Sequence, residues 1–176
     1  MAEGKKRLWT RKYANYALCN ALNRTVALNA GKAEYPFVYR IKRLAVGGSL
    51  VKTSGKVHDV DLFVEREHEP NAFANIHTKE EEIYMLFHWQ LDNFPHRFDS
   101  MMPWVQPWDE VIRWVKNQKG ILSFHPYEEL ERLNDANPVL LIDDGALTED
   151  GKRVLADGGA DHYAQVYMLL RSREAR

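Results

Sequence analysis

The feature that most constrains the fold of this chain is a glycine turn between two strand-like segments. Residues Phe37 to Val46 alternate and are rich in Val, Tyr, Ile and Leu, which is typical of a strand. Gly47-Gly48-Ser49 breaks this pattern sharply, and Val57 to Glu65 has the composition of a second strand. Because Ser49 to Lys56 has room for only one helical turn and a loop, the sequence predicts two strands on either side of a tight turn.

The spacing of apolar residues predicts the other elements. Predicted helices cover Leu8–Ala30, Lys79–Phe94, Trp108–Gln118, Pro126–Leu133 and Tyr163–Leu170, and predicted short strands cover Ile121–Phe124 and Val139–Ile142. We expect the second of these helices to start at an N-cap, Thr78, and to be largely buried. Residues 95–107 are expected to be an irregular connection. This alternation predicts an α/β (α+β) fold with a small mixed β-sheet flanked by helices.

The length of 176 residues fits one domain that buries a continuous core without disulfides. We therefore predict a single domain over residues 1–176, with residues 1–7 as a flexible basic tail. The sequence contains no internal repeat or low-complexity linker that would divide it. Residues 66–108 have the character of an insertion, and the sequence assigns them no role.

The charge balance selects no particular partner, since the net charge is -1 with 28% charged and 45% hydrophobic residues. Basic residues cluster near both ends and before the glycine turn, and such clusters are more typical of solvated helix faces than of phosphate sites. Cys19 is the only cysteine, which excludes an intramolecular disulfide and suits a reducing compartment. No apolar stretch has the length of a membrane span, so we expect a cytoplasmic protein without a membrane partner.

Two acids in the second strand form the main candidate site. Alternate residues of a strand share a face, so Asp59 and Asp61 are expected to project together, about 7 Å apart along the chain. The intervening and flanking apolar residues, Val60 and Leu62, would face the core. Paired carboxylates suit Mg²⁺ or Mn²⁺, with the phosphates of a nucleoside triphosphate and water as further ligands.

The glycine turn provides a candidate phosphate site beside these acids. Gly47 and Gly48 have no side chain, so backbone N–H groups can come close to a triphosphate. Ser49 adds a hydroxyl at the expected N-terminus of a helix, where the dipole favours negative charge. Lys52 and Lys56 could neutralise the phosphates. An ordinary β-turn followed by an edge strand with two solvated aspartates is the alternative interpretation.

These residues resemble the DNA polymerase beta-like nucleotidyltransferase superfamily, and in particular its minimal members. That family has a hydrophobic strand, a Gly-Gly/Ser turn, a gap and an Asp-x-Asp pair between apolar residues, which Gly48, Ser49, Asp59 and Asp61 match. The similarity covers roughly Leu8 to Glu65. It implies a metal-dependent enzyme that transfers a nucleoside monophosphate from ATP or another nucleoside triphosphate. The acceptor would be a small molecule, a protein or an RNA end.

The chain departs from this family at the third carboxylate, which the family usually places on a later strand. The segment Ile121 to His125 offers Ser123 and His125 but no acid, whereas the strand from Val139 leads into Asp143. Asp143 is therefore a candidate third ligand and catalytic residue, although Asp143-Asp144-Gly145 also fits a simple β-turn. Without a third acid the chain would be an inactive nucleotide-binding or protein-interaction module with the same fold.

Overall fold

The computed structural model describes residues 8–72, 74–94, 107–133 and 137–174. Its elements follow the order α1 (Arg11–Asn29), β1 (Tyr39–Gly47), α2 (Ser49–Lys52), β2 (Val60–His68), α3 (Lys79–Asn93), α4 (Pro107–Lys116), β3 (Leu122–Pro126), the 3-10 helix η2 (Tyr127–Arg132), β4 (Val139–Asp143), β5 (Ala146–Leu147), α5 (Glu149–Asp157) and α6 (Asp161–Glu174). The predicted class, a mixed sheet flanked by helices, is confirmed. The predicted tail, residues 1–7, and most of the predicted irregular connection, residues 95–107, lie outside the described residues.

The sheet has the order β3-β2-β1-β4-β5. The central strand β1 pairs antiparallel with both β2 and β4, and β2 pairs parallel with β3. The turn after β1 therefore brings Gly47 opposite Asp61 in the register of β1 and β2. The parallel pairing brings Ser123 of β3 beside Asp61 from the other side. This topology brings Gly47, Asp61 and Ser123 together at one end of strands β1, β2 and β3.

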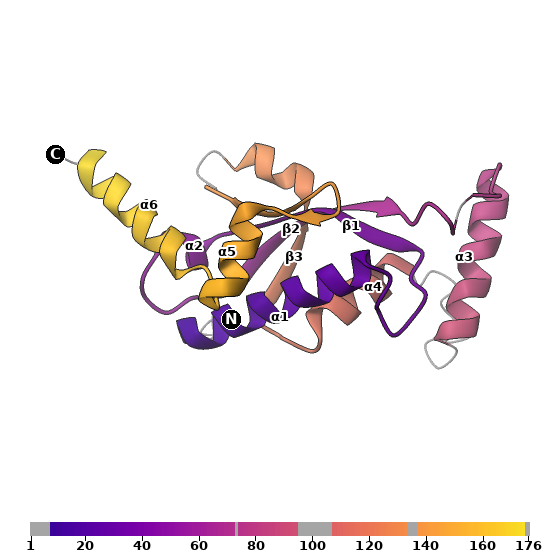
Figure 1. The fold of residues 1–176 in the computed structure, drawn as a ribbon, viewed down its shortest axis with the longest axis horizontal. Helices are drawn as coiled ribbons and strands as arrows, with labels where there is room; N and C mark the ends of the chain where they lie inside the picture. The colour runs from indigo at the N-terminus through magenta and orange to yellow at the C-terminus, as the bar shows by residue number, and fades with distance from the viewer. Residues whose placement is uncertain (1–7, 73, 95–106, 134–136, 175–176) are drawn as a thin grey trace, which may run out of the picture.

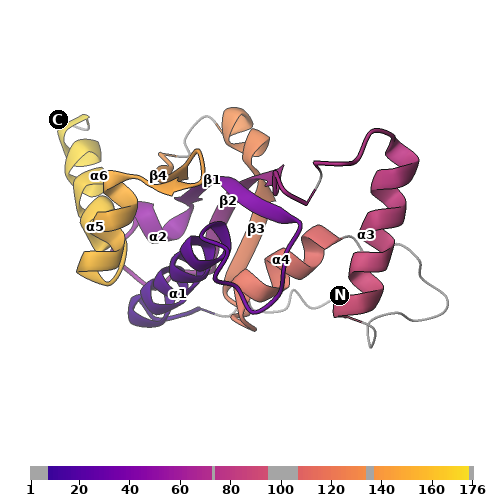
Figure 2. The same cartoon turned by 45° about the vertical axis from the view of Figure 1, so that its right-hand side comes forward.

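Alternation along the strands separates a core face from a second face. The core contains Leu44 and Val46 of β1 with Leu62 and Val64 of β2, all of them buried. Helices α1, α4 and α5 lie against this side, and Figures 1 and 2 show them grouped on one side of the strands. The second face carries charged residues, among them Arg43, whose guanidinium lies 4.1 Å from the ring of Tyr127 in η2. The candidate site therefore belongs to the polar face of the sheet.

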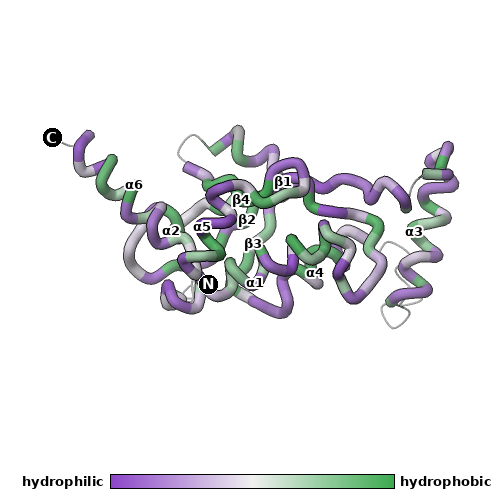
Figure 3. Tube along the Cα trace, in the orientation of Figure 1, coloured by the Kyte–Doolittle hydropathy of each residue, from purple (hydrophilic) through white to green (hydrophobic). Residues whose placement is uncertain are grey.

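Two helices lie at opposite ends of the molecule, α3 at one and α6 at the other (Figures 1 and 2). The start of α3 follows the prediction, because Thr78 and Glu81 form a reciprocal capping box. The predicted burial of α3 is wrong: Ile83 and Tyr84 are exposed, the latter by 67%, and Gln90 is its one buried residue. The reason is that, among the described residues, α3 contacts the rest of the fold along one face, where Trp89 donates to the Pro36 carbonyl and Gln90 donates to Glu110. Apolar residues are visible along both outlying helices in Figure 3.

Other elements differ from the predictions at their ends or in kind. The second strand was expected to start at Val57, but Val57 forms an isolated bridge with Trp9 and β2 begins at Val60. The helix predicted over Pro126–Leu133 is a 3-10 helix, Tyr127–Arg132. Helix α5 was not predicted, although Thr148 caps it and Gly158 ends it in the left-handed conformation. No helix in the described part of the chain is both long and apolar enough to span a bilayer.

Candidate functional site

Gly48 is the structural centre of the glycine turn. Its backbone has φ 68° and ψ -155°, a region that is essentially restricted to glycine. A Cβ atom at this position would lie 1.9 Å from Oδ2 of Asp61 and 3.0 Å from its Cγ. The missing side chain therefore allows the backbone to approach the Asp61 carboxylate closely. The structure thus brings together the turn and the second acid of the predicted site.

Asp59 and Asp61 lie at the start of β2, Asp59 just before the strand and Asp61 inside it. The pKa of Asp61 is raised, first because burial disfavours the charged carboxylate and then because the charge of Asp59 repels it. A hydrogen bond and a charge interaction with His125 oppose this rise. The two acids are therefore close enough to interact, even though Asp59 is outside the regular strand on which the predicted spacing relied.

Ser49 opens α2 beside the turn. Its Oγ atom is buried and has no hydrogen-bond partner among the described residues. Lys52 ends the same helix, and Lys56 lies exposed in the loop before β2. Helix α2 begins at Ser49, as expected, and has only four residues. The feature that the structure adds at Ser49 is a buried hydroxyl without a hydrogen-bond partner among the described residues.

The β3 side of Asp61 carries a histidine and a serine in place of an acid. Nε2 of His125 lies 3.2 Å from Oδ1 of Asp61, and its Nδ1 lies 3.5 Å from Oε2 of Glu129. The imidazole stacks on Phe63 with ring centroids 5.2 Å apart. Ser123 lies near the start of β3 and pairs with Asp61 in the register of β2 and β3. Ser123 and His125 were noted in the sequence, but Glu129 was not, and helical i,i+4 spacing could not indicate it because His125 lies in a strand.

Asp143 is not brought to this site. Strand β4 runs antiparallel to β1, so Val139 pairs with Val46 near the glycine turn and later residues of β4 lie progressively farther from it. Asp143 ends the strand, close to the point where the Gly145 N–H donates to the Lys42 carbonyl. The strand direction therefore separates Asp143 from Asp61, and the geometry gives no support to its predicted part as third ligand.

The available metal donors follow from this arrangement. Within the described ranges, no three His, Cys, Asp or Glu side chains form a group that could hold a metal ion. The acidic donors at the turn are therefore the two carboxylates of Asp59 and Asp61, and the Ser49 hydroxyl belongs to the residue directly after Gly48. Such a set is incomplete for a metal held by protein alone, but Mg²⁺ commonly takes one or two carboxylates and completes its shell with substrate phosphates and water.

A cavity of about 690 Å³ opens next to the site. His125 lines it and also contacts Asp61, so the cavity is one side chain away from the acids. Trp108 and Phe124 provide apolar wall, and Glu65 and Glu128 provide carboxylates. Trp108 was predicted to serve packing, and in the structure it also faces this open space. The volume is that of a site for a small molecule.

Comparisons with protein-family models, with curated proteins and with solved structures found no match. The interpretation of the candidate site therefore rests on its geometry alone.

Proposed function

We propose that the chain is a metal-dependent nucleotidyltransferase, which moves a nucleoside monophosphate from a nucleoside triphosphate to an acceptor and releases pyrophosphate. The observation that carries the proposal is the contact between the turn and the acids, where a Cβ on Gly48 would lie 1.9 Å from Oδ2 of Asp61. The Gly48 backbone and the Asp61 carboxylate are in direct contact there, because no side chain lies between them. A phosphate lying against Gly48 would therefore also lie against the acids that hold its counter-ion.

The residues present fit Mg²⁺ or Mn²⁺ bound together with a triphosphate. Asp59 and Asp61 would hold the ion, and their mutual repulsion, part of the raised pKa of Asp61, is the kind of interaction that a divalent cation relieves. A second observation that fits a ligand at the turn is the buried Ser49 hydroxyl, which has no hydrogen-bond partner among the described residues. When bound, such an ion neutralises phosphate charge and polarises the phosphoryl group.

The chain's own residues have distinct parts in this proposal. The glycine turn at Gly48 would offer backbone N–H groups to the triphosphate, Ser49 would donate a hydrogen bond to it, and Lys52 and Lys56 would offset its charge. His125 orients the Asp61 carboxylate through Nε2. The acceptor, a small molecule, a protein side chain or an RNA end, would enter through the cavity beside His125.

A second function is favoured by one observation: the residues of β3 beside Asp61 are Ser123 and His125, and neither is an acid. A carboxylate there would complete the metal charge balance and accept a proton from the acceptor. Without it, a module that binds a nucleotide, or a partner protein, with no turnover is the alternative. This module would keep the Gly48 and Asp61 geometry and differ only in the chemistry.

The test is incubation of the purified chain with labelled ATP, CTP, GTP and UTP in Mg²⁺ or Mn²⁺. RNA, candidate small molecules and the protein itself serve as acceptors. Transfer of label with release of pyrophosphate, abolished in Asp59→Asn, is the expected result. Mg²⁺-dependent nucleotide binding without pyrophosphate would favour the non-catalytic module. No binding of any nucleotide would contradict both the enzyme and the nucleotide-binding module, and would leave the protein-interaction module as the remaining alternative.

A further inference from the structure

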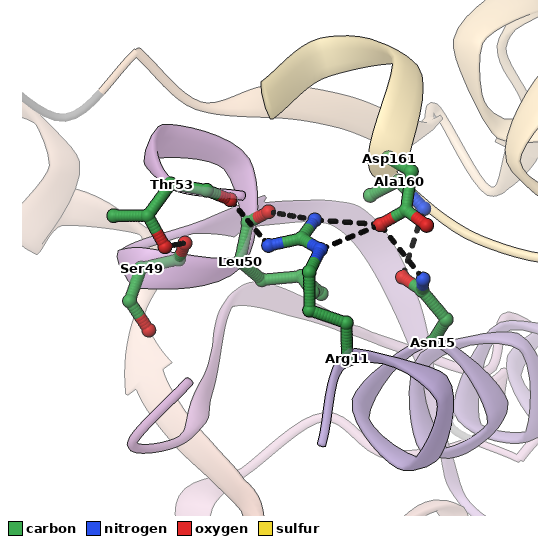
Figure 4. Close-up of polar contacts among 7 residues, drawn as sticks. All are labelled: Arg11, Asn15, Ser49, Leu50, Thr53, Ala160 and Asp161. Atoms are coloured by element: carbon green, nitrogen blue, oxygen red, sulfur yellow. Dashed lines mark hydrogen bonds and ion pairs between the residues drawn. The ribbon is translucent and has the colours of Figure 1, made fainter. Parts of the chain in front are cut away.

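Arg11 joins three elements that are far apart in the sequence (Figure 4). Its Nη2 donates to the Leu50 carbonyl at 2.8 Å, and its Nη1 donates to the Thr53 carbonyl. Its Nε and Nη2 lie 2.8 and 2.6 Å from Oδ1 of Asp161 at the start of α6. The sequence indicated a solvated arginine in a basic cluster, but the side chain is only 15% exposed. The guanidinium therefore links α1 to both α2 and α6.

Asn15, one turn farther along α1, completes this network. Its Nδ2 donates to Oδ1 of Asp161 at 2.9 Å, and its Oδ1 accepts from the Ala160 N–H at 3.1 Å. Burial alone would raise the pKa of Asp161, but the hydrogen bonds from Asn15 and Arg11 and the charge of Arg11 lower it. Asp161 is thus held as a carboxylate that keeps the guanidinium in place.

Helix α2 needs such external support because it is a single turn. Its N-cap, Gly48, makes no side-chain capping bond, and Thr53 closes the turn on the Ser49 carbonyl. An isolated turn fixes many dihedral angles for few hydrogen bonds and is unstable alone. Leu50 and Val51 are buried and hold the middle of the turn. Arg11 binds the carbonyls at its end, where the helix has no further N–H partners of its own.

The position of Arg11 is otherwise unfavourable. It is the first residue of α1, where the helix dipole disfavours a positive charge. Asp161 and the carbonyls of Leu50 and Thr53 offset this cost. The arginine fork provides several donors in one plane, which a lysine cannot match. The geometry is therefore specific for arginine.

We infer that Arg11 is a positioning residue that fixes α2, and with it the Gly48 and Ser49 turn that contacts the triphosphate. The tether to α2 is independent of ligand, whereas the phosphate contact rests on the proposed function. Arg11 touches no substrate itself. It acts through the carbonyls of Leu50 and Thr53, which set where the first residue of α2, Ser49, lies.

The experiment compares Arg11→Met with Arg11→Lys and with a matched control, Arg24→Met. Arg24 also lies on α1 and donates to a backbone carbonyl, that of Trp114, but it does not contact α2. Backbone hydrogen exchange is measured for residues 47–53 in the ligand-free protein, and the Kd of a fluorescent ATP analogue with Mg²⁺ is measured well below each melting temperature. Exchange reports the local opening of the turn, and the Kd reports the phosphate contact.

We expect Arg11→Met to speed exchange in residues 47–53 by about tenfold, and to weaken nucleotide binding by a similar factor. Arg11→Lys should fall between Arg11→Met and the unchanged protein, and Arg24→Met should leave both values unchanged. Unchanged exchange after Arg11→Met, or an equal effect of Arg24→Met, would overturn the inference. Faster exchange in a protein that binds no nucleotide would support the tether and contradict the proposed function. If Arg11→Met does not fold, exchange in Arg11→Lys decides, because that variant keeps the charge near Asp161 but loses the fork.

Discussion

Replacing Gly48 with alanine tests the contact on which the candidate site depends. The backbone conformation, φ 68° and ψ -155°, is one that L residues rarely adopt. The new Cβ would also lie 1.9 Å from Oδ2 of Asp61, so the carboxylate must rotate away. Rotation would break the 3.2 Å contact between Asp61 and His125. A single methyl group therefore disturbs both the turn and the acid.

The free-energy cost follows from these two effects. Backbone strain of this kind costs about 1–3 kcal/mol. Loss of one hydrogen bond costs about 0.5–1.5 kcal/mol. The lower entropy of the unfolded alanine variant returns about 0.4–1 kcal/mol. We therefore expect the free energy of unfolding to fall by about 2 kcal/mol, which lowers the melting temperature of a domain of this size by roughly 4–8 °C.

Denaturant unfolding of Gly48→Ala beside Gly55→Ala measures this effect. Gly55 lies in the loop after α2, its φ is not in the left-handed region, and a Cβ there would meet no atom within 4 Å. Gly55→Ala should change the free energy of unfolding by less than about 0.5 kcal/mol. The reasoning would be refuted if Gly48→Ala were as stable as Gly55→Ala, because the close approach of Gly48 to Asp61 would then not exist in solution.

Three further predictions concern the acids. The pKa of Asp61 is raised by burial and by Asp59, so the folded chain holds that proton more tightly than the unfolded chain and its stability falls as the pH rises above about 4. In urea unfolding, Asp61→Asn should therefore be more stable than the unchanged protein at pH 7, and this difference should disappear below pH ~4. If the two proteins are equally stable at pH 7 as well, the prediction is wrong. Asp59→Ala should keep its circular dichroism spectrum and lose more than about a hundredfold in transfer rate, since loss of even an outer partner of a metal ligand costs 10–100-fold. Ser123→Asp places a third carboxylate beside Asp61. The melting temperature of this variant should be lower than that of the unchanged protein without Mg²⁺ and should recover when Mg²⁺ is added. A melting temperature that does not respond to Mg²⁺ would argue against a cation at this position.

The sequence predicted those parts of the fold that depend on local chemistry. The glycine turn, the single helical turn after it and the capping of α3 by Thr78 all follow from contacts within a few residues. The predicted helix before the first strand, Leu8–Ala30, is confirmed as α1, Arg11–Asn29. The helical spacing of its apolar residues therefore placed this helix to within one turn at each end.

Features that depend on distant contacts could not be predicted in this way. The apolar residues of α3 indicated burial, but burial requires a neighbouring surface, and among the described residues α3 packs along the face that carries Trp89 and Gln90. The separation of Asp143 from Asp61 follows from the antiparallel pairing of β4 with β1, which the linear order of the strands does not reveal. The part of Arg11 depends on Asp161, which is 150 residues away. Local sequence patterns therefore identified the turn and the acids, whereas the strand order determines which other residues lie next to them.

The most direct measurement of the central claim is the Mg²⁺ dependence of nucleotide binding. A fluorescent nucleoside triphosphate is titrated into the unchanged protein, Asp59→Asn and Asp143→Asn, each with Mg²⁺ and with a chelator. The account predicts binding that requires Mg²⁺, is lost in Asp59→Asn and is unchanged in Asp143→Asn. Binding that is equally tight in Asp59→Asn, or that is indifferent to the chelator, would contradict a nucleotide site built from the glycine turn and the paired acids.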